Sequence, residues 1–484
     1  MWTKLYTVEI PATERLPCNA AAMARLLYIT NGLTGGLNAN YELARRLAKA
    51  GHTVGFLGYG DVGDSVRGQG YSFIHVTQAD RAMDQLRADL GRVGRVRAFP
   101  RGVALRRHVI GSREIEAAVS AARPDALIVD IEAHYSILAT RSLGIPTVLK
   151  NDFFSLAWER GVPPMHSEQP YPRGRRDRVT ADIAWLRAYA ERRAAMTVGE
   201  LYPAKLTRRW APFRYNTVSR RDLRAVARSR DIRLGEITSQ RDWLRPHTYP
   251  GLPMITATAR ELDFVQATSL NDQWIGPLVY RDRVDIALGP EDRERWHAFR
   301  DRNRSSGRPL LYCSFGTMVP GTSAMLARVL AAARIRPEYD VVVGLGGRDE
   351  KLVANANENI LVLDYAPQLE VLEVADAAMI LGGINTINEC LTFGVPMIVE
   401  QTGPTDGPGN ANRVAHHGVG VRAQLGSIEP ERLANLIDRV LHDHELRGRV
   451  RTMQTTFQRY EDDQIAEAAI EQLLAGRLDA TLNK

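Results

Sequence analysis

Short apolar runs alternate with longer segments of helical periodicity along most of the chain. Uninterrupted apolar runs of strand length are typical of strands buried on both faces of a parallel sheet, and the segments between them supply the crossover helices. The strands predicted in this way are residues 25–30, 53–57, 126–130 and 147–150 in the first half and residues 309–314, 340–344, 360–364, 377–381 and 396–400 in the second. The expected fold class is α/β, with two Rossmann-like domains that face each other across a cleft.

The same alternation predicts where the domains begin and end. We expect an extension over residues 1–22, with Met23 as an alternative start, and an amphipathic helix over residues 41–50 that Gly51 closes. Residues 173–266 are rich in arginine and have helical periodicity, which indicates an insertion in the first domain. The predicted division is a first domain over residues 23–275, a linker over 276–308, a second domain over 309–455 and a C-terminal helix over 456–484.

The composition is that of a soluble globular protein. A length of 484 residues exceeds what one hydrophobic core usually supports, which agrees with two domains. No apolar run approaches the ~20 residues that span a bilayer. The three cysteines have no metal-ligand spacing, and Cys313 and Cys390 lie in apolar runs, so we expect them in the core of a cytoplasmic protein.

Positive charge is concentrated in two segments. Residues 173–233 hold 17 Arg and Lys against 6 Asp and Glu, a net charge of +11, and residues 81–116 hold 9 against 4, a net charge of +5. Such segments suit an anionic partner or simply solvated helix faces, and both interpretations stay open. Of the anionic partners we expect a peripheral contact with membrane and no nucleic acid, because no aromatic stacking positions lie between the arginines.

The turn after the strand at residues 309–314 contains small residues. Ser314 and Gly316 allow backbone N–H groups to approach an anion, and Thr317 adds a hydroxyl donor. Taken alone this signal is weak, because strand-to-helix turns often have small residues for packing reasons.

A more specific series of residues follows the later strands. Each lies just after a strand or in the first turns of the helix that follows it: Tyr365, Gln368, Gly383, Asn385, Thr386, Glu389 and Asp406. Their order resembles the donor signature of the family 1 glycosyltransferases, the UDP-glycosyltransferase superfamily of GT-B fold. The resemblance covers residues 310–420 well and the first 150 residues more loosely. It implies inverting, metal-independent transfer of a sugar from a nucleotide-diphosphate sugar to a small acceptor.

The resemblance also implies the donor contacts. Tyr365 would stack on the base, where the family commonly has Trp, and Gln368 would lie beside the base and ribose. Asn385 and Thr386 would hold phosphate at a helix N-terminus. Glu389 would accept both ribose hydroxyls, which favours a UDP-sugar as co-substrate, with GDP- or dTDP-sugars as alternatives and no further cofactor.

Two positions depart from the family pattern. Leu381 stands where the family usually has a His that donates to the diphosphate, and Gly407 stands where a Gln usually follows the sugar-binding Asp406. The diphosphate charge must then be met by backbone N–H groups, by Thr317 or by an arginine that the sequence does not identify. Asp406 stays a predicted sugar contact, and the identity of the sugar is open.

The acceptor half lacks the base that the family usually has. Its catalytic His ahead of the first helix is replaced by Gly36, which follows Gly35, and such a pair suits close approach of a ligand or of the facing domain. The candidate bases follow the strand at residues 126–130. Asp130 matches the carboxylate that orients the missing His, His134 titrates near neutral pH, and Glu132 would serve if burial raised its pKa. A thiol or amine acceptor would need no strong base.

Three residues after the strand at 147–150 lie where the acceptor pocket is expected: Asp152, Phe153 and Phe154. The aromatic pair would suit a lipophilic or natural-product acceptor, and it would equally suit the core. Two alternative functions stay open, a non-catalytic nucleotide-sugar-binding relative and a GT-B-fold epimerase of the sugar nucleotide. His416 and His417 form no predicted metal site, because adjacent residues on a helix do not face one way.

Overall fold

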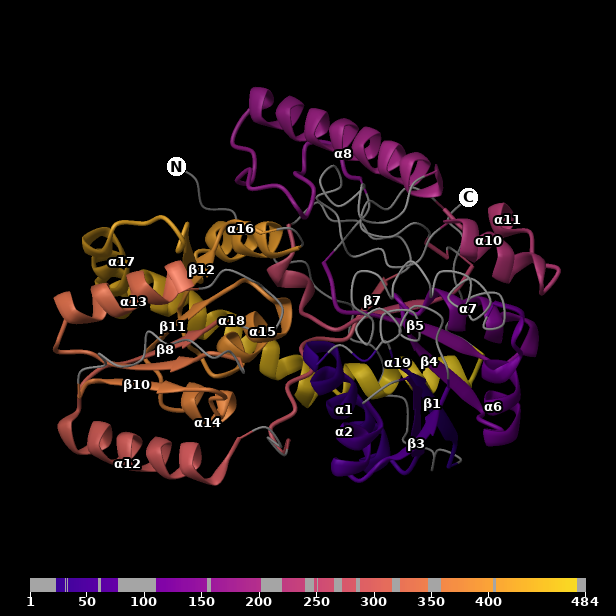
Figure 1. The fold of residues 1–484 in the computed structure, drawn as a ribbon, viewed down its shortest axis with the longest axis horizontal. Helices are drawn as coiled ribbons and strands as arrows, with labels where there is room; N and C mark the ends of the chain where they lie inside the picture. The colour runs from indigo at the N-terminus through magenta and orange to yellow at the C-terminus, as the bar shows by residue number, and fades with distance from the viewer. Residues whose placement is uncertain are drawn as a thin grey trace, which may run out of the picture.

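Two α/β domains lie side by side, each built around a parallel sheet (Figure 1). The computed structural model describes residues 23–30, 32, 34–59, 62–76, 110–154, 158–201, 220–239, 248–249, 251–264, 272–283, 288–315, 323–346, 358–403 and 406–476. The predicted extension over residues 1–22 lies outside this range, and so do Gly316 and Thr317. The expected fold class, two Rossmann-like domains, is confirmed.

The N-terminal sheet has the strand order β3-β2-β1-β4-β5-β6-β7, and all its described pairings are parallel. Its strands are β1 (Arg25–Ile29), β2 (Thr53–Gly58), β3 (Ser72–His75), β4 (Ala126–Asp130), β5 (Thr147–Asn151), β6 (Met254–Thr256) and β7 (Asp272–Trp274). Every residue of β4 is buried, which accounts for its uninterrupted apolar pattern. The strand order reverses between β1 and β4, and ligands of such sheets bind beyond the carboxyl ends of the strands at this point.

The helices of this domain are α1 (Thr34–Lys49), α2 (Val62–Gly68), α6 (Glu114–Ala122), α7 (His134–Thr140), α8 (Arg175–Leu201), α10 (Arg220–Arg228) and α11 (Leu234–Ile237), with the 3₁₀ turns η1 (Arg141–Leu143) and η2 (Arg260–Leu262). Helix α1 begins at Thr34, so the prediction of a start at residue 41 was wrong. Leu37 and Asn40 are buried, so the face that packs on the sheet begins in the first turn of the helix, before residue 41.

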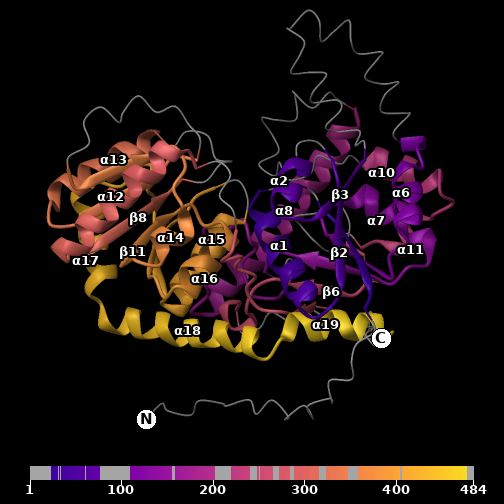
Figure 2. The same cartoon turned by 90° about the horizontal axis from the view of Figure 1, so that it is seen from below.

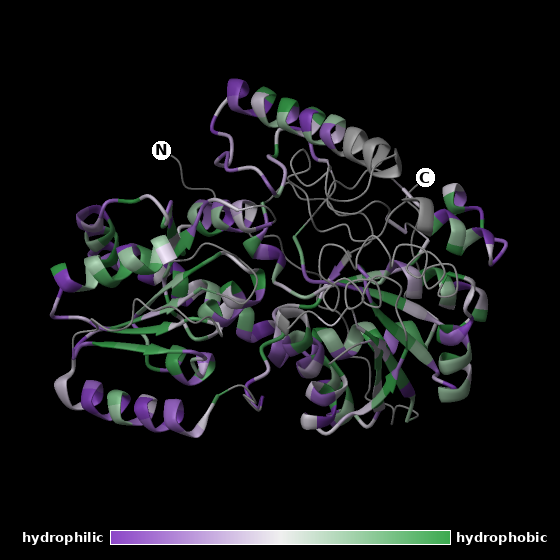
Figure 3. Ribbon diagram, in the orientation of Figure 1, coloured by the Kyte–Doolittle hydropathy of each residue, from purple (hydrophilic) through white to green (hydrophobic). Residues whose placement is uncertain are grey.

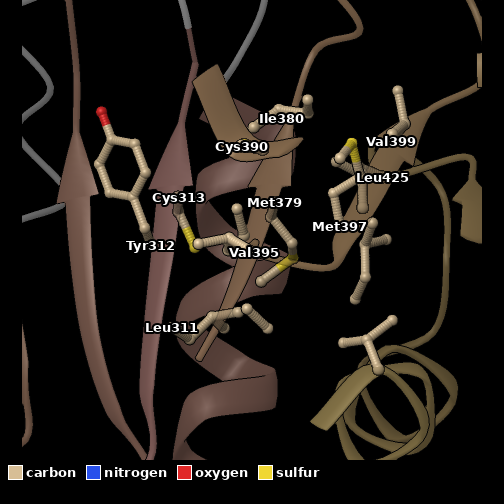
Figure 4. Packing of buried hydrophobic residues seen from close by; sticks show 14 of the residues in the cluster. Leu311, Tyr312, Cys313, Met379, Ile380, Cys390, Val395, Met397, Val399 and Leu425 are labelled. Carbon is tan, nitrogen blue, oxygen red and sulfur yellow. The ribbon is translucent and has the colours of Figure 1, made fainter. Parts of the chain in front are cut away.

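The C-terminal sheet repeats the arrangement in the order β10-β9-β8-β11-β12-β13. Its strands are β8 (Leu310–Ser314), β9 (Asp340–Gly344), β10 (Ile360–Leu363), β11 (Ala377–Ile380), β12 (Met397–Glu400) and β13 (Gly420–Ala423). Figure 4 shows its core, where Cys313 of β8 and Cys390 pack among Met379, Val395 and Met397. Both cysteines are buried as predicted, and burial raises the pKa of both thiols.

The helices of the second half correct the predicted domain ends. They are α12 (Pro290–Ser306), α13 (Ser323–Ile335), α14 (Gln368–Leu372), α15 (Ile384–Thr392), α16 (Gly407–His417), α17 (Pro430–His442), α18 (His444–Asp462) and α19 (Ile465–Leu474). The expected linker over residues 276–308 contains α12, whose Trp296 and Phe299 belong to the core of the second domain. The expected C-terminal helix from residue 456 begins inside α18, and Ala466 and Ile470 of α19 return to the core of the first domain. Figure 2 shows α18 and α19 running beneath both domains.

The insertion predicted over residues 173–266 ends earlier than expected, because β6 belongs to the N-terminal sheet. Helix α8 forms its first part and buries Trp185. The opposite face exposes Val179, Ile183 and Leu186 at 56–58% of their surface, and Figure 3 shows hydrophobic and hydrophilic residues alternating along this helix while the strands are mainly hydrophobic. Among the described residues, no helix has the length and apolar character needed to span a membrane.

Candidate functional site

The N-terminus of helix α15 lies beyond the carboxyl end of β11, at the point where the C-terminal strand order reverses. Gly382 makes the turn with φ of +83°, and a β-carbon there would lie 3.1 Å from the carbonyl oxygen of Gly407, so the position requires glycine. Gly383 takes the N-cap position without a side-chain cap, and a β-carbon on it would meet no described atom within 4 Å. The first backbone N–H groups of α15 therefore have no side-chain cap from Gly383, and N–H groups at such a helix end, next to Asn385 and Thr386, suit an anion.

A carboxylate with two protein partners lies further along the same helix. Glu389 is 6% exposed, and its Oε1 accepts a hydrogen bond at 2.8 Å from Nη1 of Arg283. Its Oε2 accepts from Nε2 of Gln368. The side chains of Arg283 and Glu389 are 8% and 7% exposed, so this is a largely buried ion pair. The sequence pattern did not identify Arg283, because it lies between the domains and in no recognisable motif.

Gln368 is fixed from the other side by the end of β8. Its Oε1 accepts hydrogen bonds from the hydroxyl of Tyr312 at 3.0 Å and from Ser314 at 3.2 Å. Burial raises the pKa of Tyr312, so its hydroxyl stays protonated and can donate. The structure thus brings Ser314, Gln368 and Glu389 together as predicted from the sequence, although their roles toward a ligand remain predictions.

Two further predicted donor residues differ in exposure. Tyr365 follows β10 and is 38% exposed, which leaves its ring accessible for stacking. Asp406 is 6% exposed and stands at the N-cap of α16, where it accepts a hydrogen bond from Nδ2 of Asn410 at 2.8 Å. That hydrogen bond engages one carboxylate oxygen of Asp406 within the protein.

The facing edge of the N-terminal sheet holds a closed polar cluster around Asp130, which is 3% exposed at the end of β4. Its carboxylate accepts hydrogen bonds from the hydroxyl of Thr30 at 2.9 Å, from that of Tyr28 at 3.3 Å and from Nδ2 of Asn40 at 3.3 Å. Burial, and then the Asp130 carboxylate, raises the pKa of Tyr28 well above its ordinary value. The cluster joins β1, β4 and α1 at the first switch point.

The other two predicted bases lie on the same segment. His134 begins α7 and is 3% exposed, with its Nδ1 3.1 Å from the hydroxyl of Tyr249 and the two rings 5.8 Å apart. Glu132 is half-buried in the turn before α7. The side chain of His134 is therefore packed against Tyr249 inside the N-terminal domain. Its role as a base stays a prediction.

The position where the family has its catalytic His is occupied from another element. Gly36 lies in the first turn of α1, and a β-carbon placed on it would lie 3.3 Å from Oδ2 of Asp152. Asp152 follows β5, and its Oδ1 forms an ion pair with the buried ammonium of Lys150. One residue earlier, a β-carbon on Gly35 would lie 3.6 Å from Nδ2 of Asn385. The first turn of α1 therefore lies against the first turn of α15 in the other domain.

The aromatic pair after β5 corrects one expectation. Phe153 and Phe154 are 9% and 1% exposed and belong to the core shared with the second domain, so they do not line an open acceptor pocket. The guanidinium of Arg413 in α16 stacks 4.6 Å from the ring of Phe154 and donates to Asp263 at 2.6 Å. Arg413 belongs to the second domain, and its buried guanidinium needs a counter-ion and packed neighbours, which Asp263 and Phe154 of the first domain supply. These contacts therefore link the two domains.

The adjacent histidines of α16 also contribute to this interface. Nε2 of His417 lies 2.9 Å from the carbonyl oxygen of Asp263, and the ring of His416 packs 4.3 Å from that of Tyr171. Burial lowers the pKa of both histidines. The two side chains thus contact different parts of the first domain.

Known proteins share this two-domain GT-B architecture. The "Crystal Structure Analysis of the Glycotransferase of kitacinnamycin" superimposes with a TM-score of 0.63 at 18% identity, covering 94% of this chain and 99% of that one. Residues 328–467 match the family "Erythromycin biosynthesis protein CIII-like, C-terminal domain".

Curated relatives match over a shorter stretch. The demethyllactenocin mycarosyltransferase of Streptomyces fradiae is 30% identical over 169 residues, 35% of this chain and 36% of its own length. The uncharacterized UDP-glucosyltransferase YdhE of Bacillus subtilis (strain 168) is 28% identical over 166 residues, 34% of this chain and 42% of its own. The matched stretches thus span less than half the length of these relatives. The fold of the chain is therefore the GT-B fold of these solved glycosyltransferases, and its C-terminal half is similar in sequence to the glycosyltransferases named here.

Proposed function

We propose that this chain transfers a sugar from a nucleoside-diphosphate sugar to a small acceptor, with inversion at the sugar carbon and without a metal. The observation that carries the proposal is the approach of the two domains. The uncapped N-terminus of α15 lies against the first turn of α1, and Asn385 is the side chain that faces Gly35. A diphosphate held by α15 would place its sugar at the facing domain, where an acceptor could reach it.

The nucleoside part of the donor would lie along α15. Glu389 would accept hydrogen bonds from the ribose hydroxyls, and Tyr365 is accessible for stacking on the base. Because a 2′-hydroxyl gives the carboxylate a second donor, we favour a UDP-sugar over a dTDP-sugar. The name of one relative, a UDP-glucosyltransferase, agrees with this choice.

Arg283 would meet part of the diphosphate charge. Leu381 cannot donate to phosphate where the family usually has a His, and Arg283 is the cation that contacts the ribose-binding carboxylate. Its guanidinium donates to Oε1 of Glu389, and we propose that a ribose hydroxyl takes its place when the donor binds. The displaced guanidinium remains beside α15 and can pair with the diphosphate, for which arginine is well suited.

The acceptor is proposed to be a small natural product. This rests on the names of the relatives, a demethyllactenocin mycarosyltransferase and a glycotransferase of kitacinnamycin, and on the match to an erythromycin biosynthesis family. Catalysis would then depend on positioning, on stabilising the departing diphosphate and on one general base. The reaction itself is proposed to be cytoplasmic.

The proposal is tested by incubating the full chain with UDP-glucose, dTDP-glucose and GDP-mannose and measuring release of the nucleoside diphosphate. Slow release with water as acceptor, fastest from the UDP-sugar, is the expected result. Release from none of the three, combined with tight binding of one of them, would point to a non-catalytic nucleotide-sugar-binding protein. A change in the sugar while it stays attached to the nucleotide would point to an epimerase.

A peripheral membrane contact is proposed for helix α8. Its exposed Val179, Ile183 and Leu186 lie on one face with arginines of the same helix around them, as in helices that lie at a membrane surface. Flotation with anionic liposomes at low salt tests the contact. Liposome binding that high salt abolishes would support the proposed membrane contact, and an absence of binding at low salt would contradict it.

A further inference from the structure

The side chain that fills the place of the missing catalytic His belongs to Asp152. Gly36 occupies the family's His position, and a β-carbon there would already lie 3.3 Å from Oδ2 of Asp152. A contact of 3.3 Å is tight for a β-carbon, so a residue larger than glycine would have to push the carboxylate aside. The glycine at position 36 therefore leaves room for the carboxylate of Asp152. A side chain from the residue after β5 fills the place that the family's His, on α1, would fill.

The two oxygens of this carboxylate have different environments. Oδ1 is held by the ammonium of Lys150, whose side chain is 0% exposed, and Oδ2 points toward the open position at Gly36. The Asp152 side chain is 19% exposed, so a ligand can reach it. Lys150 thus fixes the rotamer of Asp152 and leaves one oxygen for a small ligand.

Of the other candidate bases, Glu132 is half-buried in the turn before α7, and Asp130 and His134 are less accessible than Asp152. Asp130 is 3% exposed and accepts hydrogen bonds from Tyr28, Thr30 and Asn40. His134 is equally buried and contacts Tyr249. A general base must come within hydrogen-bond reach of the acceptor hydroxyl, and of these groups Asp152 meets that geometric condition best.

Asp152 also lies on the correct side of the molecule. Gly35, the neighbour of Gly36, is the residue that faces Asn385 at the N-terminus of α15. A hydroxyl hydrogen-bonded to Oδ2 of Asp152 would therefore lie close to a sugar whose diphosphate is held by α15. Of the atoms that a β-carbon on Gly35 or Gly36 would contact within 4 Å, the carboxylate is that of Asp152.

We propose that Asp152 is the general base of the transfer reaction, an inference that rests on the proposed function. The acceptor oxygen forms a bond to C1 of the sugar while the bond from C1 to the diphosphate oxygen breaks. The electron pair of that bond leaves with the nucleoside diphosphate, and the hydroxyl proton passes to Oδ2 of Asp152. Lys150 acts as a positioning residue through its ion pair with Oδ1.

The test uses donor hydrolysis, in which water must lose a proton, and azide, an anion that attacks without losing one. Asp152→Asn should lower the rate of UDP-sugar hydrolysis by about 10²–10⁴-fold, the usual contribution of a general base. Azide should restore turnover of the variant and yield the glycosyl azide, while the affinity for UDP stays unchanged. Hydrolysis by Asp152→Asn at the wild-type rate, or a loss that azide does not restore while UDP still binds, would overturn the proposal.

Two further variants keep the result interpretable. Asp152→Asn leaves Lys150 buried without its counter-ion, so the double variant Lys150→Met with Asp152→Asn serves if the single variant does not fold. It should fold, remain inactive in hydrolysis and respond to azide. Asp438→Asn, a matched substitution far from the site whose partner is Arg336, should hydrolyse the donor at the wild-type rate. If the wild type hydrolyses no donor, the proposed function fails, and the inference on Asp152 fails with it. If the wild type hydrolyses the donor and Asp152→Asn does so equally fast, only the inference on Asp152 fails.

Discussion

The two domains have the same strand order around their switch points, yet they use this point differently. In the C-terminal domain the turn after β11 leaves the first N–H groups of α15 without a side-chain cap. In the N-terminal domain the equivalent point after β1 and β4 is closed by a buried cluster around Asp130. The same fold thus offers a site for a ligand at the switch point of the C-terminal domain, while the switch point of the N-terminal domain is filled by its own side chains.

The second difference concerns where charge is held. The donor half pairs Glu389 with Arg283, an arginine from the segment between the domains. The acceptor half pairs Asp152, which follows β5, with Lys150 of β5. Ligand binding is expected to break the first pair and to keep the second, and the predictions below separate these cases.

The largest effect is expected where the halves are joined. Replacing Asp263 with Ala leaves the guanidinium of Arg413 buried without its counter-ion, because both side chains are at most 2% exposed. The free energy of unfolding should fall by about 3–5 kcal/mol. Urea unfolding measures it, with Asp438→Ala as the control, whose pair with Arg336 is more exposed and should matter less. An equal fall in the free energy of unfolding of both variants would mean that the buried pair at the domain interface stabilises the protein no more than the exposed pair.

The next effect concerns the ribose. Replacing Glu389 with Ala removes a charged acceptor, so the affinity for UDP should fall by roughly 10- to 100-fold, or about 1.5–3 kcal/mol. Isothermal titration with UDP and 2′-deoxy-UDP measures it, and the deoxy nucleotide should lose less. The role assigned to Glu389 fails if both nucleotides lose the same factor or neither loses any.

A smaller effect is expected at the proposed diphosphate contact. Replacing Arg283 with Gln should lower the affinity for UDP by about tenfold, because a charge-assisted hydrogen bond is lost. The affinity for uridine, which has no phosphate, should stay the same or rise, since its ribose no longer has to displace the guanidinium from Glu389. Parallel titrations with UDP and uridine measure the ratio of the two affinities. An equal fall in both affinities would mean that Arg283 has only a structural role.

A separate effect, on the pH dependence of stability, follows from three histidines whose pKa is lowered. Burial lowers the pKa of His166 from 6.5 to about 4 and also lowers those of His416 and His417. The unfolded chain therefore takes up protons first, so stability is full above about pH 6.5 and falls as the pH drops toward 4. The contribution of His166 is at most about 3 kcal/mol. Thermal unfolding between pH 7 and pH 4 measures it, and a profile that His166→Asn leaves equally steep would exclude this residue as the cause.

The sequence predicted the strands that are long apolar runs and missed the shorter or less buried ones. All the strands predicted from apolar runs appear within one residue of their expected ends. The strands that were not predicted are β3, β7 and β13, which lie at sheet edges, and the three-residue strand β6, which lies inside its sheet. An edge strand such as β3 is only partly buried, so its sequence shows no apolar run.

The candidate site divides in the same way. Ser314, Gln368 and Glu389 were recognised because each follows a strand in a local motif, and the structure brings them together. Arg283 and the contact between Gly36 and Asp152 were not recognised, because each depends on residues far apart in the chain that only the folded domains bring together. The aromatic pair Phe153 and Phe154 was compatible with a pocket or with the core, and only the packing of the two domains decided between them.

The central claim is that the N-terminus of α15 holds a nucleoside diphosphate opposite the first turn of α1. A crystal structure of the chain with UDP tests it most directly. The expected result is a ribose on Glu389, with Arg283 moved from Oε1 toward the diphosphate, and phosphate oxygens on the first N–H groups of α15. UDP bound elsewhere, or bound here with the pair of Arg283 and Glu389 intact and the N-terminus of α15 unoccupied, would contradict the account.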